Sequence, residues 1–271
     1  MNLSMYTAYA NSKVFPSFSD GLRHFYDKGV RYGAFLDVEL SQIPFHRYCD
    51  YLEDAGLQLD AFISTLDVVS FSEEKRKDNM ARLKEQIDLM EKRGIPILMI
   101  APSVIAAKSE EERLQMRELM VESYSAAIDY AADSGIQVAV ENFSLLTRSD
   151  SRMEDLRYLF DCVPKLGFVI DSGNFFCIGE DVLEAYELLC DRIIHAHFKD
   201  WTWDPFGDVV RENIPRFTGV ALGQGVLPLR ELAQRLRQDK PNLNVVLEIN
   251  GKLTKQCLDD SVGFLTEVFM K

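Results

Sequence analysis

Phe168-Val169-Ile170-Asp171 is a short run of aromatic and β-branched residues that stops at an acid. Three other segments in the second half of the chain repeat this pattern and end in a metal-binding side chain: Val138-Ala139-Val140-Glu141, Ile193-Ile194-His195-Ala196-His197 and Val245-Val246-Leu247-Glu248. Runs of this kind are typical of buried parallel strands. If such strands close into a barrel, their carboxyl ends meet at one mouth, which is where barrel enzymes carry their active sites.

The four terminal side chains Glu141, Asp171, His197 and Glu248 predict a divalent-metal site at that mouth. Carboxylates about 4 Å apart repel by about 4 kcal/mol per pair at an effective dielectric constant near 20. A cation or protonation is needed to hold them together. The alternative is that each is an unrelated strand-end residue, solvated or capping a helix, but four coincidences favour the metal.

Strand-like and helix-like segments alternate along the whole chain, which favours βα units and a parallel sheet. Besides the four strands above, we expect strands at residues 3–9, 32–40, 57–66 and 95–100. We expect helices from Ser17, from Pro44 to Gly56, at 72–92, from Ser109 to Gly135, and at 153–162, 182–189, 229–237 and 258–270. The 271 residues, with no linker or second domain, predict an α/β fold: a (β/α)8 TIM barrel forming one domain over residues 1–271.

Composition restricts the partners and the compartment. The net charge is −13 and no basic patch is found, which disfavours nucleic acid and anionic lipid as partners. The five cysteines are scattered, odd in number and form no C-x-x-C, so reduced thiols in a cytoplasmic protein are expected. No signal peptide is recognised at the start, and no apolar run has the length of a membrane span.

The strand ends resemble those of the xylose-isomerase-like barrel superfamily, which includes sugar-phosphate isomerases and epimerases. The resemblance covers nearly the whole chain and is carried by Val140-Glu141-Asn142, Ile170-Asp171-Ser172-Gly173-Asn174, His195-Ala196-His197-Phe198-Lys199-Asp200 and Leu247-Glu248, with weaker matches at Asp37-Val38-Glu39-Leu40 and Gly223-Gln224-Gly225-Val226. It implies Mn²⁺, Mg²⁺, Co²⁺ or Zn²⁺ held by Glu141, Asp171, His197 and Glu248. His195 is expected one layer deeper, in packing or in support of the ligands.

Two departures leave the substrate and the reaction open. The family commonly has histidine three residues after the strand-six aspartate, where this chain has Asn174, an amide that cannot shuttle a proton near neutral pH. The ketose 3-epimerases have arginine six residues after the strand-seven histidine, where this chain has Trp203.

A metal centre of this kind suits proton transfer next to a carbonyl. The cation would polarise the carbonyl of a hydroxy-ketone sugar and stabilise an enediolate. Glu141 and Glu248 come from separated strands, so we expect them to act from opposite sides as base and acid, as the resemblance also suggests. Return of the proton on the opposite face gives epimerisation, and return at the neighbouring carbon gives isomerisation.

Four further residues are candidates for binding a small-molecule carbohydrate substrate: Lys199, Asn174, Trp201 and Glu39. Lys199 would contact an oxyanion or a phosphate, or instead pair with Asp200, Asp171 or Glu248. The tryptophans of the long connection before the last strand would stack on a sugar, or instead pack the loop or a subunit interface. Glu39 would reach the rim or serve folding alone.

The first functional hypothesis is a metal-dependent sugar or sugar-phosphate isomerase or epimerase. A dehydratase or other lyase on the same centre, and a non-catalytic sugar-binding barrel, are the alternatives. A nuclease is disfavoured, because the abasic-DNA branch needs histidines where this chain has Ser64-Thr65-Leu66 and Ala101-Pro102-Ser103. Gly223-Gln224-Gly225 is interpreted as a turn, not a dinucleotide motif. A homo-oligomer is expected from the resemblance alone.

Overall fold

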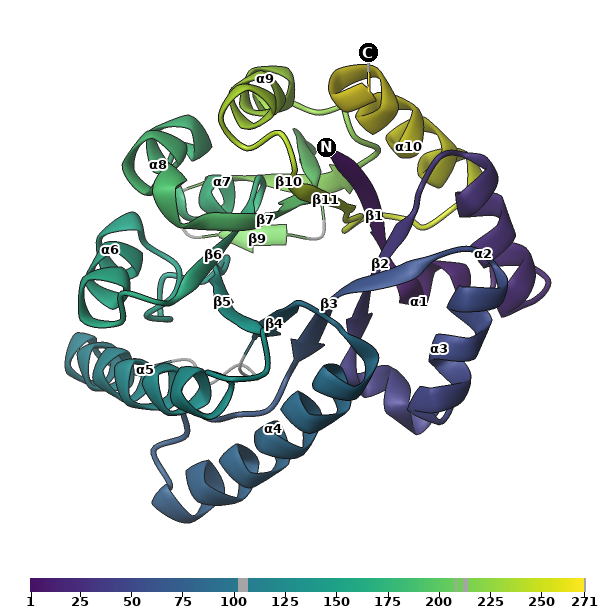
Figure 1. Ribbon diagram of the computed structural model, residues 1–271. Coiled ribbons are helices and arrows are strands. Elements are labelled where there is room, and N and C mark those ends of the chain that lie inside the picture. Colours follow the sequence, from purple (N-terminus) through teal and green to yellow (C-terminus); the bar gives the residue numbers. More distant parts are fainter. Residues whose placement is uncertain (102–106, 208, 212–213, 271) are drawn as a thin grey trace.

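Eight parallel strands pair edge to edge into a closed ring in the computed structural model, which describes residues 1–101, 107–207, 209–211 and 214–270 (Figure 1). The barrel strands are β1 (Asn2–Tyr6), β2 (Tyr32–Leu36), β3 (Gln58–Ser64), β4 (Ile97–Ile100), β5 (Gln137–Glu141), β6 (Gly167–Asp171), β7 (Ile193–Phe198) and β11 (Asn244–Leu247). Their order around the ring is β1-β11-β7-β6-β5-β4-β3-β2. The predicted single-domain TIM barrel is therefore confirmed. Pro102 and Ser103, used above against a nuclease, lie outside the described residues.

Helices surround the ring on its outer side (Figure 1). The main ones are α2 (Phe18–Asp27), α3 (Phe45–Asp54), α4 (Glu73–Arg93), α5 (Glu110–Tyr130), α6 (Met153–Cys162), α8 (Val182–Leu189), α9 (Leu229–Asp239) and α10 (Lys255–Met270). Ser72 and Ser109 cap α4 and α5 by accepting hydrogen bonds from backbone N–H groups. Gly94 ends α4 at φ +64°, a conformation that favours glycine. The predicted helices at 153–162 and 182–189 match α6 and α8.

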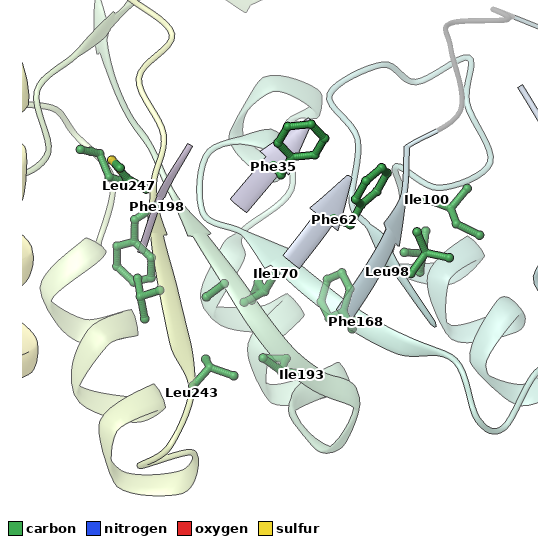
Figure 2. Close-up of a cluster of buried hydrophobic side chains, with 14 of the residues drawn as sticks. Phe35, Phe62, Leu98, Ile100, Phe168, Ile170, Ile193, Phe198, Leu243 and Leu247 are labelled. Atoms are coloured by element: carbon green, nitrogen blue, oxygen red, sulfur yellow. The ribbon is translucent and has the colours of Figure 1, made fainter. Parts of the chain in front are cut away.

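Strand alternation sorts the apolar side chains into two layers. Phe168 and Ile170 of β6 face outward into the layer between strands and helices, which Figure 2 shows in close-up. Val169, between them, faces inward. It belongs to the apolar cluster of the ring interior, whose other members are Tyr6, Ala34, Ala61, Ile63, Ile97, Met99, Ala139 and Val246. Asp171 follows Val169 by two residues, so it belongs to the inward series and points into the barrel mouth.

All four strands predicted by residue range are shorter in the structure, and two of them end in helical turns. After β1 the chain turns into α1 (Thr7–Ala10), and after β2 it turns into the 3-10 helix η1 (Asp37–Ser41). Glu39 stabilises this second turn, because its carboxylate accepts a hydrogen bond from the backbone N–H of Leu36 at 3.1 Å. Polar side chains that satisfy backbone groups locally favour a turn over a continuing strand.

The long connection between β7 and β11, expected to be a loop, contains a three-stranded antiparallel sheet in the order β8-β10-β9. Its strands are β8 (Asp200–Trp203), β9 (Val209–Arg211) and β10 (Ile214–Val220). Trp201 of β8 packs edge-on against Phe217 of β10, with ring centroids 5.1 Å apart. Together with Cys177 they form a separate small apolar cluster, which gives these short strands a core of their own. None of the helices in the described residues could span a membrane.

Candidate metal centre

The structure brings Glu141, Asp171, His197 and Glu248 together at the barrel mouth. One potential ligand atom from each side chain lies within 4.8 Å of the others. His197 Nδ1 is 2.6 Å from Glu141 Oε1 and 3.5 Å from Glu248 Oε2. The four residues come from β5, β6, β7 and the residue that follows β11, four neighbouring positions on the ring.

Residues that follow β5 and β6 hold Asp171 in place. The side-chain amide of Asn142 bonds to both backbone groups of Asp171, accepting from its N–H at 2.7 Å and donating to its carbonyl at 3.1 Å. Oδ1 of Asp171 accepts from the N–H groups of Gly173 and Asn174 at 2.9 and 2.7 Å, where the short helix α7 (Asn174–Ile178) begins. One carboxylate oxygen is thereby held by the backbone, and Oδ2 is left to face the centre.

Lys199 contacts two of the four candidate ligands. Its Nζ lies 2.6 Å from Glu248 Oε1 and 3.1 Å from Asp171 Oδ2, and it donates to Asn174 Oδ1 at 3.2 Å. Burial lowers the pKa of Lys199, but the carboxylates of Asp171 and Glu248 raise it by more, so the ammonium form is kept. Of the ion pairs considered from the sequence, those with Asp171 and Glu248 are formed. Asp200 instead accepts backbone hydrogen bonds.

The negative charge of the centre exceeds what Lys199 neutralises. Burial, with Glu248 as the next cause, raises the pKa of Glu141 to about 8. Burial also raises the pKa of Asp171 to about 8, against the opposing effect of Lys199. Burial opposes ionisation of Glu248 as well, but Lys199 and His197 lower its pKa overall. Burial lowers the pKa of His197, so its imidazole is neutral at pH 7.

These residues fit a divalent cation. Asp171 Oδ2 is buried and forms no hydrogen bond with any described residue, although Lys199 pairs with it, and His197 Nδ1 faces the carboxylates of Glu141 and Glu248. Three carboxylates and a neutral imidazole are the donor set of catalytic divalent-metal sites. A cation there would hold all three carboxylates in their charged form, which burial alone disfavours.

Tyr6, at the end of β1, supports the centre and had no role in the sequence interpretation. Its hydroxyl donates to Glu248 Oε2 at 3.2 Å and lies 3.2 Å from His197 Nδ1. Burial and the neighbouring Glu248 raise the pKa of Tyr6, so the hydroxyl stays a donor. A tyrosine ending an apolar strand was the available signal, but tyrosines often end strands for packing alone.

A second polar group lies one layer deeper in the barrel, where His195 was expected. His195 Nε2 is 3.2 Å from Asp60 Oδ2 on β3. Asp60 also accepts from Ser4 Oγ at 3.0 Å and from Asn244 Nδ2 at 2.9 Å. The rings of His195 and His197 are 5.5 Å apart, so the two layers touch. Asp60 was missed, although an acid within the apolar run Leu59–Ile63 marked it.

A cavity of about 410 Å³ opens over the centre. It is lined by Glu141, Phe143, Ser144, Asn174, Lys199, Trp201, Glu248 and Asn250. Three of the four predicted substrate residues therefore line it, together with Phe143, Ser144 and Asn250, which the sequence interpretation did not single out. Asn174, which stands where the family has histidine, also donates to the Asn142 carbonyl at 2.8 Å.

Glu39, the fourth predicted substrate residue, does not line this cavity. Its buried carboxylate accepts hydrogen bonds from Thr7 Oγ1 at 3.0 Å, from the Leu36 N–H at 3.1 Å and from the Tyr48 hydroxyl. The structure gives Glu39 a part in holding the turn after β2, and substrate binding by Glu39 stays a prediction.

This protein is a (β/α)8 barrel with a candidate metal centre. Three acids and a histidine converge at the carboxyl ends of its parallel strands. Residues 27–268 match the family described as xylose isomerase-like TIM barrel, and the chain belongs to that family.

Two solved structures and one curated protein are similar to this chain. A solved structure of the IOLI protein with a bound zinc atom has a TM-score of 0.80 at 16% identity and covers 99% of this chain and 98% of its own. D-psicose 3-epimerase from Clostridium cellulolyticum H10, solved with D-tagatose, has a TM-score of 0.75 at 13% identity, with 99% of both chains covered. The 3-oxo-isoapionate decarboxylase of Pectobacterium atrosepticum is 29% identical over 117 residues, which span 42% of this chain and 39% of the relative.

Proposed function

We propose that this protein is a divalent-metal-dependent isomerase or epimerase that moves a proton at the carbon next to the carbonyl of a sugar or sugar phosphate. The observation that carries the proposal is the placement of Glu141 and Glu248. Both line the same cavity, both belong to the cluster of candidate ligands, and their strands β5 and β11 are separated in the ring by β6 and β7. Two carboxylates reaching one carbon from different strands suit a base and an acid.

Glu141, Asp171, His197 and Glu248 would hold the cation. When bound, it would polarise the substrate carbonyl and so acidify the neighbouring C–H bond. Mn²⁺, Mg²⁺, Co²⁺ and Zn²⁺ all suit this donor set. The zinc bound in the IOLI structure supports such a site in this fold.

Side chains of the protein would transfer the proton and orient the substrate. Glu141, which a bound cation would hold as a carboxylate, is suited to accept the proton from the substrate carbon. Glu248 takes the complementary role. Lys199, Asn174 and Trp201 line the cavity, where they would orient the substrate oxygens.

Carbon–hydrogen exchange tests the proposal directly. The metal-loaded protein is incubated in D₂O with a panel of ketoses, and deuterium at carbon is followed by NMR. We expect exchange in the wild type and its loss in Glu141→Gln and in Glu248→Gln. Glu180→Gln is the matched control, because Glu180 bonds to the Met153 N–H outside the cavity and its loss leaves the centre intact. Full exchange in both site variants would refute the acid–base assignment, and sugar binding without exchange would indicate a non-catalytic barrel.

A lyase on the same centre is the second candidate. The match to a decarboxylase over 117 residues favours it, since loss of carbon dioxide or water from a keto substrate passes through the same type of intermediate. Product analysis in the same assay separates the two, because a lyase changes the substrate formula and an isomerase does not.

The setting we propose is cytoplasmic, with a small carbohydrate as the partner. None of the five cysteines forms a disulfide bond, as expected of a reducing compartment, and the net charge of −13 opposes nucleic acid. A homo-oligomer is part of the proposal and is tested by light scattering.

A further inference from the structure

Arg148 is among the largest fully buried side chains of the described residues, and the proposed reaction does not use it. It lies in the connection between β5 and α6 and is 1% exposed. A guanidinium group taken out of water needs a compensating charge. Asp150, which is equally buried, supplies it: Nε of Arg148 donates to Asp150 Oδ1 at 2.8 Å, and Nη2 donates to Oδ2. The two residues therefore form a buried ion pair held by two hydrogen bonds.

This ion pair holds Phe143 through both its ring and its backbone. Cζ of Arg148 lies over the ring of Phe143, 4.0 Å from the ring centroid. The backbone N–H of Phe143 donates to the carbonyl oxygen of Asp150 at 2.9 Å. Phe143 follows Glu141 by two residues and lines the cavity over the centre. A residue of the cavity wall is thus tied to a charge pair that does not itself line the cavity.

Phe143 is the aromatic ring that the cavity leaves available to a ligand. Trp201, the other aromatic residue of the described lining, is 4% exposed and packs edge-on against Phe217. Phe143 is half-buried. The remaining lining residues are polar or charged: Glu141, Ser144, Asn174, Lys199, Glu248 and Asn250. A polyhydroxy compound bound here therefore meets polar partners for its oxygens and one apolar surface for its C–H groups.

We propose that Phe143 determines specificity by packing against the C–H face of the substrate, and that Arg148 is the positioning residue that holds this ring at the cavity wall. The inference rests on the proposed function and deepens it. Because the ion pair exists before any ligand arrives, the ring needs little ordering on binding, which favours affinity. Loss of either contact should therefore weaken substrate binding more than it slows proton transfer.

Replacing Phe143 tests the contact with the substrate. Rates of deuterium incorporation into the ketose that exchanges best, measured over a range of ketose concentrations with metal-loaded protein, give kcat and KM. We expect KM to rise by about 10-fold or more in Phe143→Ala and kcat to stay within about 3-fold of the wild type, because the lost contact is made before and during proton transfer alike. Phe206→Ala is the matched control, since Phe206 is 89% exposed and does not line the cavity. An unchanged KM in Phe143→Ala overturns the inference.

A double variant tests the positioning role of Arg148. Arg148→Met combined with Asp150→Leu removes both charges, so no unpaired buried charge remains. We expect KM to rise by about 10-fold here as well, because the ring of Phe143 loses the group that holds it. The matched control makes the same two replacements in a second buried pair, Arg113 and Asp155, which lies on α5 and α6 and does not line the cavity. A rise in KM that is equal in both double variants, or absent from the first, overturns the positioning role.

Binding measurements separate this inference from the proposed function. If the wild type exchanges no ketose, the proposed function fails, and calorimetric titration with the same ketoses then decides. Tighter binding to the wild type than to Phe143→Ala supports the inference, and equal binding or none overturns it. If circular dichroism shows that the first double variant does not fold, Arg148→Lys takes its place, since it keeps a cation beside Asp150 but lacks the planar group over the ring. An unchanged KM in Arg148→Lys then overturns the positioning role.

Discussion

Nζ of Lys199 lies 2.6 Å from Oε1 of Glu248, so a cationic group of the chain itself sits on one of the four candidate metal ligands. The same ammonium group contacts Asp171. In the metal-free protein Lys199 is therefore the main positive charge that compensates the buried acids of the centre.

Replacing Lys199 with methionine tests this compensation. Without the ammonium group Glu248 is a buried charge with no ionic partner, and we expect the metal-free protein to lose about 3–5 kcal/mol of unfolding free energy. A saturating divalent cation restores much of this loss, so metal stabilises Lys199→Met more than the wild type. Urea unfolding with and without chelator measures both effects. Lys77→Met, which removes an exposed pair with Glu73, serves as control and should change stability by less than about 1 kcal/mol.

The stability of the metal-free protein should fall as pH rises from 6.5 to 8. Glu141 and Asp171 have folded pKa values of about 8, above their ordinary values of 4.5 and 3.8. In this window the folded state binds more protons than the unfolded state, so the unfolding free energy decreases with pH. His197 opposes this trend only below its unfolded pKa of 6.5, since burial lowers its folded pKa.

A bound cation should remove that pH dependence, because it keeps the carboxylates charged in the folded state. Urea titrations across pH 6.5 to 8, with chelator or with metal, provide the comparison. Metal affinity should rise over the same window, with protons released on binding. A metal-free protein whose stability is flat or increases with pH would contradict the assignment.

Tyr6→Phe should weaken metal binding while the barrel stays folded. The lost hydroxyl bonds to Glu248 and lies near His197, and removing such a partner of a ligand lowers metal affinity by about 10- to 100-fold. Calorimetric titration gives the affinity. Tyr186→Phe breaks a tyrosine–carboxylate bond to Asp239 away from the centre, so it controls for loss of a hydroxyl. Equal affinities in all three proteins would exclude a role for Tyr6.

Asp60→Ala should lower the stability of the fold more than it lowers the affinity for metal. It leaves His195, Ser4 and Asn244 without a shared buried acceptor, which we expect to cost about 3–5 kcal/mol. Because Asp60 bonds to none of the four candidate ligands, the metal affinity of the folded variant should change by less than that of Tyr6→Phe. A larger effect on affinity than on stability would show that the deeper layer sets the ligand positions.

The inward position of Asp171 could be predicted from the sequence because strand alternation is a local rule. Phe168 and Ile170 face the helices, so Asp171 and Val169 face the interior. The same alternation puts Glu141 and His197 on the inward side, because Val140 and Ala196 face the helices. Once parallel strands are taken to close into a ring, their ends must converge, and no further information is needed to bring the acids together.

Tyr6 and Asp60 could not be predicted, because their roles depend on which strands are neighbours in space. Tyr6 meets Glu248 only because β1 pairs with β11, and Asp60 meets His195 across the barrel interior. The small sheet β8-β10-β9 was missed for a related reason: its core is built by contacts between Trp201 and Phe217, sixteen positions apart, and not by a repeating pattern within one segment.

The pairing of β1 with β11 means that the ring closes only when the first and the last barrel strand are both in place. The first strand stays an open edge until the last one pairs with it, and the seam then seals along Asn2 to Met5 and Asn244 to Leu247. Glu248 directly follows β11, so the fourth candidate ligand reaches the centre when the ring closes. A chain that lacks the last strand therefore has neither a closed ring nor a complete set of candidate ligands.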